Sequence, residues 1–203
     1  MKISAIYKSG QTESGAPGIL VWPDSVWLKN GKPMFLPDED ETYHVILALC
    51  LRIDKVGKSV AEKFAHRYYR EAAYSAILLG RRPYEALKNG SDPLACDICT
   101  DCCILTGNFI DKTIWRDIKN INLTISPLLI KERTFQEEIS LAFDAEKFQH
   151  SCDEAIAAAS VRNTLKTGDL IFPSLPTEGF EAKLDTKMEV KGDGSELLRF
   201  NIK

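Results

Sequence analysis

The sequence lacks a long hydrophobic run, and it has little excess of charge of either sign. Polar residues follow Met1, Lys2 and Ile3 closely, so the apolar core of a signal peptide and an apolar span of about 18 residues are both missing. The 26 Lys and Arg residues face 29 Asp and Glu, a formal net charge of -3. This balance argues against the positive field that attracts nucleic acid or anionic lipid. We therefore expect a cytoplasmic protein that binds neither nucleic acid nor a membrane.

Internal repeats and linker-like stretches are also missing from the sequence. A chain of 203 residues can bury one substantial core. We expect one domain over residues 1–203, in which the N-terminal segment 1–40 packs loosely. Within that segment, Ser9–Gly18 is rich in Gly, Ser and Thr, which predicts a loop.

Cysteine is scarce outside one short cluster. Four of the six cysteines are Cys96, Cys99, Cys102 and Cys103, which is not the dispersed pattern of a secreted disulfide-bonded protein. Thiolates at C-x-x-C spacing can bind zinc or an iron–sulfur centre. The fourth cysteine directly follows the third, which is awkward geometry for four ligands, and free cysteines also pack as small hydrophobic residues. We favour free thiols, with a zinc site as the alternative.

Three regions have the residue patterns of β-strands. Tyr43–Ile53 is apolar on both faces, as expected of a central strand covered on both sides. Apolar residues alternate with polar ones from Ile121 to Ile125, the period of a half-buried strand. Strand and turn patterns fill Asp169–Lys203, where Gly192–Gly194 predicts a tight turn.

Two capping-box patterns predict helices. The first joins Ser59 to Glu62, and the second joins Ser151 to Glu154. The helical stripe after the first pattern comprises Ala61, Phe64, Ala65, Tyr68 and Ala72. The helix after the second pattern buries Ala155, Ile156 and Ala159 and runs about four turns to a stop at Gly168. The fold class predicted from these patterns is a β-rich α+β domain.

Several stretches in a fixed order resemble one enzyme family. They are Pro23–Ser25 with Leu28–Pro33, Gly57–Ser59 with Ala61–Tyr69, Leu165–Phe172, and the closing Leu198–Ile202. In this order and spacing, which span most of the chain, they resemble the fumarylacetoacetate hydrolase family. The resemblance is to its small members, the acylpyruvate hydrolases and 2-hydroxyhepta-2,4-diene-1,7-dioate isomerases.

The resemblance implies a fold of mixed β-sheets rolled around a central pocket with few helices, usually in a homodimer. It also implies that three carboxylates bind Mg²⁺ or Mn²⁺, since hard oxygen ligands suit a hard cation. In that family the metal grips the diketo or 2-oxo acid group of the substrate and stabilises the enolate that forms.

The chain departs from the family at all three metal-ligand positions. His44 matches the histidine that leads the His-x-Glu-x-Glu strand, but Ile46 and Ala48 stand where the two carboxylates belong. Ile77 stands at the position of the third ligand. A shift of the alignment by one residue recovers no carboxylate at any of the three positions. We therefore expect a dry, apolar pocket floor, since a carboxylate cluster without its cation is costly to bury.

Other catalytic positions of the family are altered too. Its lysine before Pro-Asp-Ser is Trp22 here, its second lysine is Ile98, and only Asp101 survives from the segment that follows. The substrate-contacting loop appears as Pro173–Pro176. The residues expected to line the pocket are Ile46, Ala48, Ile77, Ile98, Ser174 and Leu175.

The sequence thus favours a catalytically inactive homologue that serves as a binding or structural protein and needs no cofactor. Its expected partners are a second copy of the chain and a small organic acid. The alternative is an Mg²⁺- or Mn²⁺-dependent enzyme acting on acylpyruvates or related 2-oxo acids. That enzyme would use relocated ligands such as His44, Asp101 or the cysteines.

Overall fold

The computed structural model describes residues 1–7, 18–38, 41–91, 103–128 and 136–203. In these residues the strands form two sheets, A and B. Sheet A contains β1 (Lys2–Tyr7), β2 (Gly18–Pro23), β3 (Trp27–Lys29), β4 (Tyr43–Ile53), β5 (Tyr69–Gly80), β6 (Cys103–Thr106), β7 (Ile110–Asp111), β10 (Leu170–Phe172) and β11 (Phe180–Glu181). Sheet B contains β8 (Ile121–Pro127), β9 (Glu137–Leu141), β12 (Thr186–Gly192) and β13 (Ser195–Ile202). The helices are α1 (Glu62–Ala65), α2 (Arg81–Lys88), α3 (Lys112–Asp117) and α4 (Ala145–Arg162), with a 3₁₀ turn at Asp24–Val26.

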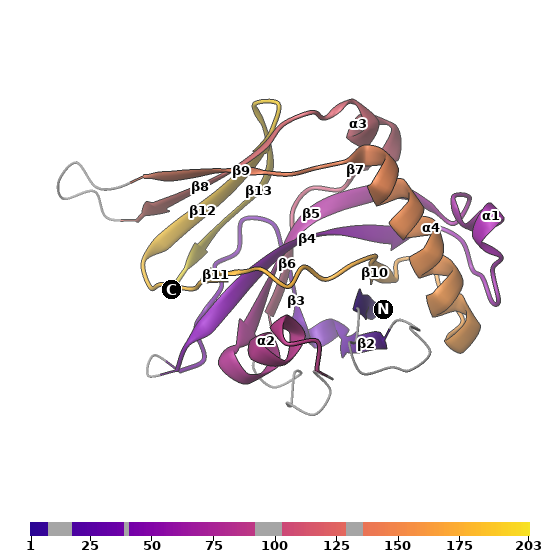
Figure 1. Cartoon of the computed structure of the whole chain (residues 1–203), viewed down its shortest axis with the longest axis horizontal. Coiled ribbons are helices and arrows are strands. Elements are labelled where there is room, and N and C mark those ends of the chain that lie inside the picture. Colours follow the sequence, from indigo (N-terminus) through magenta and orange to yellow (C-terminus); the bar gives the residue numbers. More distant parts are fainter. Residues whose placement is uncertain (8–17, 39–40, 92–102, 129–135) are drawn as a thin grey trace.

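Sheet A is built around its two longest strands, β4 and β5, which cross the middle of the molecule (Figure 1). Its strand order is β2-β1-β10-β4-β5-β6-β3, with β11 paired to β4 and β7 paired to β5. The sheet is mixed, because β1 pairs with β10 and β3 with β6 in parallel while the other pairs are antiparallel. The central strand predicted at Tyr43–Ile53 is confirmed as β4.

Sheet B is an antiparallel sheet in the order β13-β12-β8-β9. The strand predicted at 121–125 is confirmed as part of β8, and the C-terminal strands are confirmed as β10 to β13. The turn between β12 and β13 has positive φ at Asp193 (44°) and Gly194 (86°), which glycine adopts without steric cost. The β-rich α+β prediction with few helices is therefore confirmed.

Alternation along β4 and β5 gives sheet A two buried faces. One face carries Val45, Leu47 and Leu51, which pack with sheet B and α4 in the larger hydrophobic cluster. The other face carries Ile46 and Ala48, which pack with α2 and with β1, β2 and β10. We call this second group the α2-side cluster. In Figure 1 the two groups of covering elements, sheet B and α2, lie on opposite sides of β4 and β5.

The first predicted helix is wrong beyond its first turn. α1 ends at Ala65, and the chain enters β5 at Tyr69. Ser59 has a φ of 51° and caps nothing, since the N-cap residue is Ala61 and makes no side-chain bond. The apolar residues from Tyr69 onward gain more from pairing along β4, which buries them on both faces, than from extending a short helix.

The second predicted helix exists but begins earlier than the pattern indicated. Asp144 caps α4, because its carboxylate accepts the amides of Glu146 and Lys147 at 3.1 Å each. Ser151 lies inside the helix, and α4 ends at Arg162 rather than at Gly168. The predicted buried face at Ala155, Ile156 and Ala159 is confirmed.

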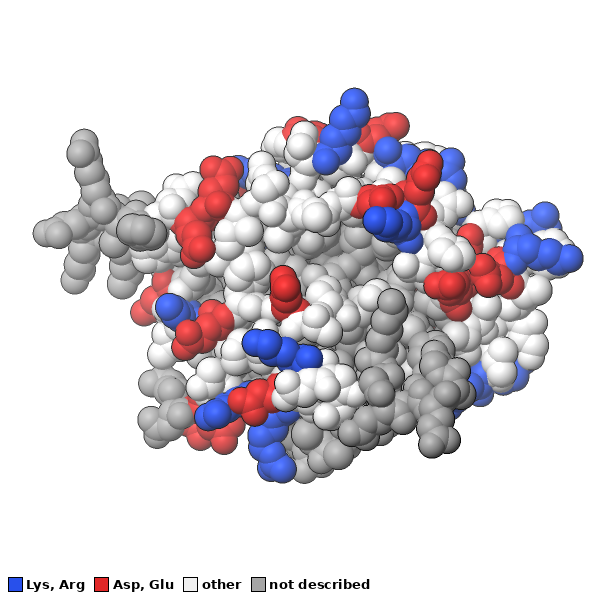
Figure 2. All heavy atoms as spheres, viewed as in Figure 1, with Lys and Arg blue, Asp and Glu red and all other residues white. Residues whose placement is uncertain are grey.

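β1 lies inside sheet A between β2 and β10, and its residues Ile3 and Ala5 are fully buried. The loose packing expected for residues 1–40 as a whole stays a prediction. Through the described parts of the chain, no helix is long and apolar enough to cross a membrane. Among the described residues on the face in Figure 2, Lys and Arg are interspersed with Asp and Glu.

Candidate functional site

The three aliphatic residues predicted to stand at the metal-ligand positions meet on one face of sheet A. Ile46 on β4 is the register partner of Ile77 on β5, and Ala48 lies two residues further along β4 on the same face. Ile46 and Ile77 are 0% exposed and Ala48 is 4% exposed, and all three belong to the α2-side cluster. We call these residues the aliphatic trio. The resemblance implies two ligands two residues apart on one strand and a third on the strand after the helix, and here β4 carries Ile46 and Ala48 while β5, which follows α1, carries Ile77.

The aliphatic trio does not fit a divalent cation. Hydrocarbon side chains have no lone pairs, and Mg²⁺ and Mn²⁺ prefer oxygen ligands. A polar pair on the same face is formed by Ser75, opposite Ala48, and Cys50, with 3.4 Å between Ser75 Oγ and Cys50 Sγ. Burial raises the pKa of the Cys50 thiol to about 12, so no thiolate forms there at neutral pH. Among the described residues no three His, Cys, Asp or Glu side chains group as metal ligands do.

The other residues expected in the pocket lie in different environments. Leu175 belongs to the α2-side cluster, and its amide donates to the carbonyl of Ile6 at 3.0 Å. Ser174 is exposed, next to that cluster in the chain. Ile98 and Asp101 lie outside the described residues, and their assignment stays a prediction.

His44 lies on the same face of sheet A as the aliphatic trio, and it contacts α2. Its ring stacks on the ring of Tyr84, with 3.9 Å between centroids and 12° between planes. Its Nδ1 atom is buried and has no hydrogen-bond partner among the residues that the structure describes. Burial lowers the pKa of His44, against the opposing effect of the Glu181 carboxylate, so the neutral imidazole is favoured. Held by this stacking, His44 packs as an aromatic side chain.

Of the four clustered cysteines, only Cys103 is among the described residues. It opens β6, is a free thiol, and burial raises its pKa to about 11. Cys96, Cys99 and Cys102 lie outside the described part of the chain. The zinc site therefore stays an untested alternative.

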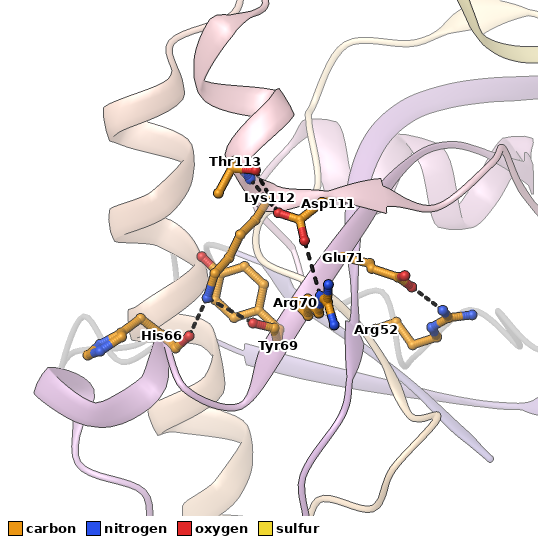
Figure 3. A network of polar contacts seen from close by, with 8 residues as sticks. All are labelled: Arg52, His66, Tyr69, Arg70, Glu71, Asp111, Lys112 and Thr113. Carbon is orange, nitrogen blue, oxygen red and sulfur yellow. Dashed lines mark hydrogen bonds and ion pairs between the residues drawn. The ribbon is translucent and has the colours of Figure 1, made fainter.

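A cleft that the sequence did not reveal opens at the other end of the same face. Past Ile46, Ala48 and Cys50, the next residue on that face of β4 is Arg52, whose guanidinium forms an ion pair with Glu71 on β5 (Figure 3). Arg52 lines a cleft of about 590 Å³ together with Trp27, Lys29, Thr106, Phe109 and Leu170. One signal was available in the sequence, namely a charged residue that ends the apolar face of β4.

The fold of the chain is shared with solved enzyme structures. Fumarylpyruvate hydrolase from Pseudomonas aeruginosa, solved in complex with Mn²⁺ and pyruvate, is 16% identical with a TM-score of 0.69; the match covers 100% of this chain and 89% of that one. The 5-carboxymethyl-2-hydroxymuconate delta-isomerase of Mycobacterium smegmatis is 17% identical with a TM-score of 0.68, over 99% of this chain and 78% of that one. Maleylpyruvate hydrolase from Sphingobium is 16% identical with a TM-score of 0.65, over 99% and 70% of the two chains.

No family model matches the sequence, and neither does any curated protein. The structural likeness extends over essentially the whole chain, and it agrees with the family resemblance that the sequence motifs indicated. The chain therefore has the fold of the fumarylacetoacetate hydrolase family.

Proposed function

We propose that this chain is a member of the fumarylacetoacetate hydrolase family that has lost metal-dependent catalysis and serves as a binding protein. The observation that carries the proposal is the aliphatic trio, packed and buried where the resemblance puts the three carboxylate ligands. The fold and the ordered motifs support family membership, and the trio argues against the family's chemistry.

The packing of the aliphatic trio explains why a metal would be excluded. Ile46 and Ile77 expose no surface to water, so a cation entering between them would lose its hydration shell and gain no ligand. The cost of transferring an ion into such a medium without compensation is prohibitive. Hydrophobic burial stabilises the same side chains by about 1.5 to 3 kcal/mol each relative to exposure. These residues therefore support the fold and cannot activate a substrate.

The residues around the aliphatic trio also argue against metal-dependent catalysis. Trp22 stands where the resemblance puts a lysine, and its side chain is 1% exposed in the α2-side cluster. Ser75 and Cys50 contact each other, and neither carries charge at neutral pH. A hydrolytic mechanism needs a group that polarises the substrate carbonyl and a base, and none of these neighbours supplies either.

An acylpyruvate cleavage assay tests the proposal. The purified protein is incubated with fumarylpyruvate and with a shorter acylpyruvate, each with added Mn²⁺ or Mg²⁺ and each with chelator. The fumarylpyruvate hydrolase of Pseudomonas aeruginosa serves as the positive control. We expect no turnover above the protein-free rate. Turnover that chelator abolishes and Mn²⁺ restores would overturn the proposal in favour of relocated ligands.

A further inference from the structure

The cleft beside Arg52 has the size of a small-molecule site. Its volume of about 590 Å³ lies within the range of about 300 to 1,000 Å³ that ligand pockets occupy. A second cleft of about 330 Å³ adjoins it, since Asn30 and Asn108 line both. The larger cleft therefore continues into a polar extension that begins at two amide side chains.

Among the described residues that line the larger cleft, the charged side chains are of one sign. Lys29 and Arg52 line it, and its described lining residues include no Asp or Glu. Arg52 is held from two sides, by the ion pair with Glu71 and by the ring of Phe109, whose centroid lies 4.7 Å from the guanidinium carbon. A guanidinium has five N–H donors, so the pair with Glu71 leaves donors for a second carboxylate. The cleft is thus prepared for an anion, with its arginine already oriented.

The walls of the cleft suit a flat, apolar ligand body. Trp27 has its indole fixed, because Nε1 donates to Thr106 Oγ1 at 3.0 Å and Thr106 is itself buried. Phe109 and the buried Leu170 add aromatic and aliphatic surface. Aromatic rings favour stacked or edge-on contact with other planar groups. The fixed indole offers such contact with little loss of conformational entropy on binding.

We propose that this cleft binds a planar, unsaturated carboxylic acid without a metal ion. The carboxylate lies at Arg52, with Lys29 adding attraction, and the planar body lies against Trp27 and Phe109. A polar substituent at the far end reaches the amides of Asn30 and Asn108. This site goes beyond the proposed function, because its cations replace a metal as the anion-binding group and its residues are outside the aliphatic trio.

Calorimetric titration with 4-hydroxybenzoate in the presence of chelator tests the site. We expect saturable binding with a Kd between about 10 μM and 1 mM. Two matched probes separate the contributions: 4-hydroxybenzamide has the same shape without charge, and cyclohexanecarboxylate has the charge without planarity. Both should bind at least about tenfold more weakly.

Matched variants locate the binding. Arg52→Gln should weaken 4-hydroxybenzoate binding at least about tenfold, and Lys29→Gln about threefold. The control is Arg70→Gln, because Arg70 also pairs with a carboxylate, Asp111, and does not line the cleft (Figure 3). The Arg70→Gln variant should bind 4-hydroxybenzoate with a Kd within about twofold of the Kd of the unmodified protein.

Three results would overturn the site. They are no saturable binding up to about 5 mM, equal binding of acid and amide, or unchanged binding by Arg52→Gln with an unaltered circular dichroism melt. If Arg52→Gln fails to fold, two other measurements test the site. They are the titration of Lys29→Gln and the ratio of the affinities for 4-hydroxybenzoate and 4-hydroxybenzamide. Because chelator is present throughout, failure here is distinct from metal-dependent turnover in the cleavage assay.

Discussion

At the scale of single residues, one face of β4 changes its chemistry along its length. Ile46, Ala48 and Cys50 are buried in the α2-side cluster, and Arg52 reaches the cleft at the end of the strand. The aliphatic residues were identifiable from sequence, since strand alternation assigns them to one face. The cleft was not, because Trp27, Arg52, Thr106 and Phe109 come from separate segments that only the fold brings together.

Shortening Ile77 should cost far more stability than shortening an exposed isoleucine. Ile77→Ala removes a fully buried side chain opposite Ile46, and we expect it to lower the free energy of unfolding by about 2 to 5 kcal/mol. Ile114, which is 50% exposed, provides the control, and Ile114→Ala should change it by less than about 0.5 kcal/mol. Urea denaturation measures both. Equal effects would show that the α2-side cluster is not packed as described.

Asp169 should make stability depend on pH in the acid range. Its buried carboxylate accepts the amides of Lys2 and Lys166 at 2.8 and 2.9 Å and pairs with the Lys2 ammonium at 3.0 Å. Burial opposes the charged form, but these partners outweigh it and lower the pKa of Asp169 below its ordinary 3.8. A lowered pKa means that the carboxylate stabilises the fold above that ordinary value and loses this effect as pH falls through the folded value.

The variant Asp169→Asn should therefore cost about 1.5 to 3 kcal/mol at neutral pH and progressively less below about pH 4. Urea denaturation at a series of pH values measures the difference. Asp117→Asn, at an exposed position, is the control and should leave the pH profile unchanged. A penalty for Asp169→Asn that is constant with pH would refute the role given to its charge.

At the scale of elements, long apolar patterns predicted the structure better than short capping patterns did. Tyr43–Ile53 could be identified because apolar residues occupy both faces over most of its eleven residues. Ser59 and Ser151 both carry a capping-box pattern, yet neither begins a helix. Four residues specify a cap weakly, and the pairing of β5 with β4 and the reach of α4 over sheet A are tertiary effects that no local pattern contains.

The start of α4 gives a direct test of this difference. Asp144→Ala removes a side chain that accepts two amides, and we expect a loss of about 1 kcal/mol in the free energy of unfolding. Ser151→Ala falls inside the helix and should change it by less than about 0.5 kcal/mol. Thermal or urea denaturation compares the two. The reverse order of effects would favour the sequence-based start at Ser151.

At the scale of the whole molecule, the ordered motifs predicted the fold more fully than the element patterns did. The patterns gave only a β-rich α+β domain, whereas the resemblance gave the family fold that the solved structures share. The sequence did not predict which parts of the fold are tightly packed and where a cleft opens. The residues of the trio are buried, and within the described part of the chain a cleft opens near Arg52.

The family resemblance also leads us to propose a homodimer in solution. Sedimentation velocity of the intact chain at micromolar concentration should give a single species with the mass of two chains. Raising the salt concentration should leave that species unchanged if apolar surface dominates the contact, since screening weakens only charged contacts. A species with the mass of one chain would contradict the proposed homodimer.

Manganese binding tests the central claim most directly, since the claim is that residues 46, 48 and 77 provide no ligands. Protein freed of metal by chelator and dialysis is titrated with Mn²⁺, and free Mn²⁺ is followed by electron paramagnetic resonance. The fumarylpyruvate hydrolase of Pseudomonas aeruginosa, solved with Mn²⁺, is the positive control. We predict no stoichiometric binding tighter than about 100 μM. One Mn²⁺ per chain held with micromolar affinity would contradict the account.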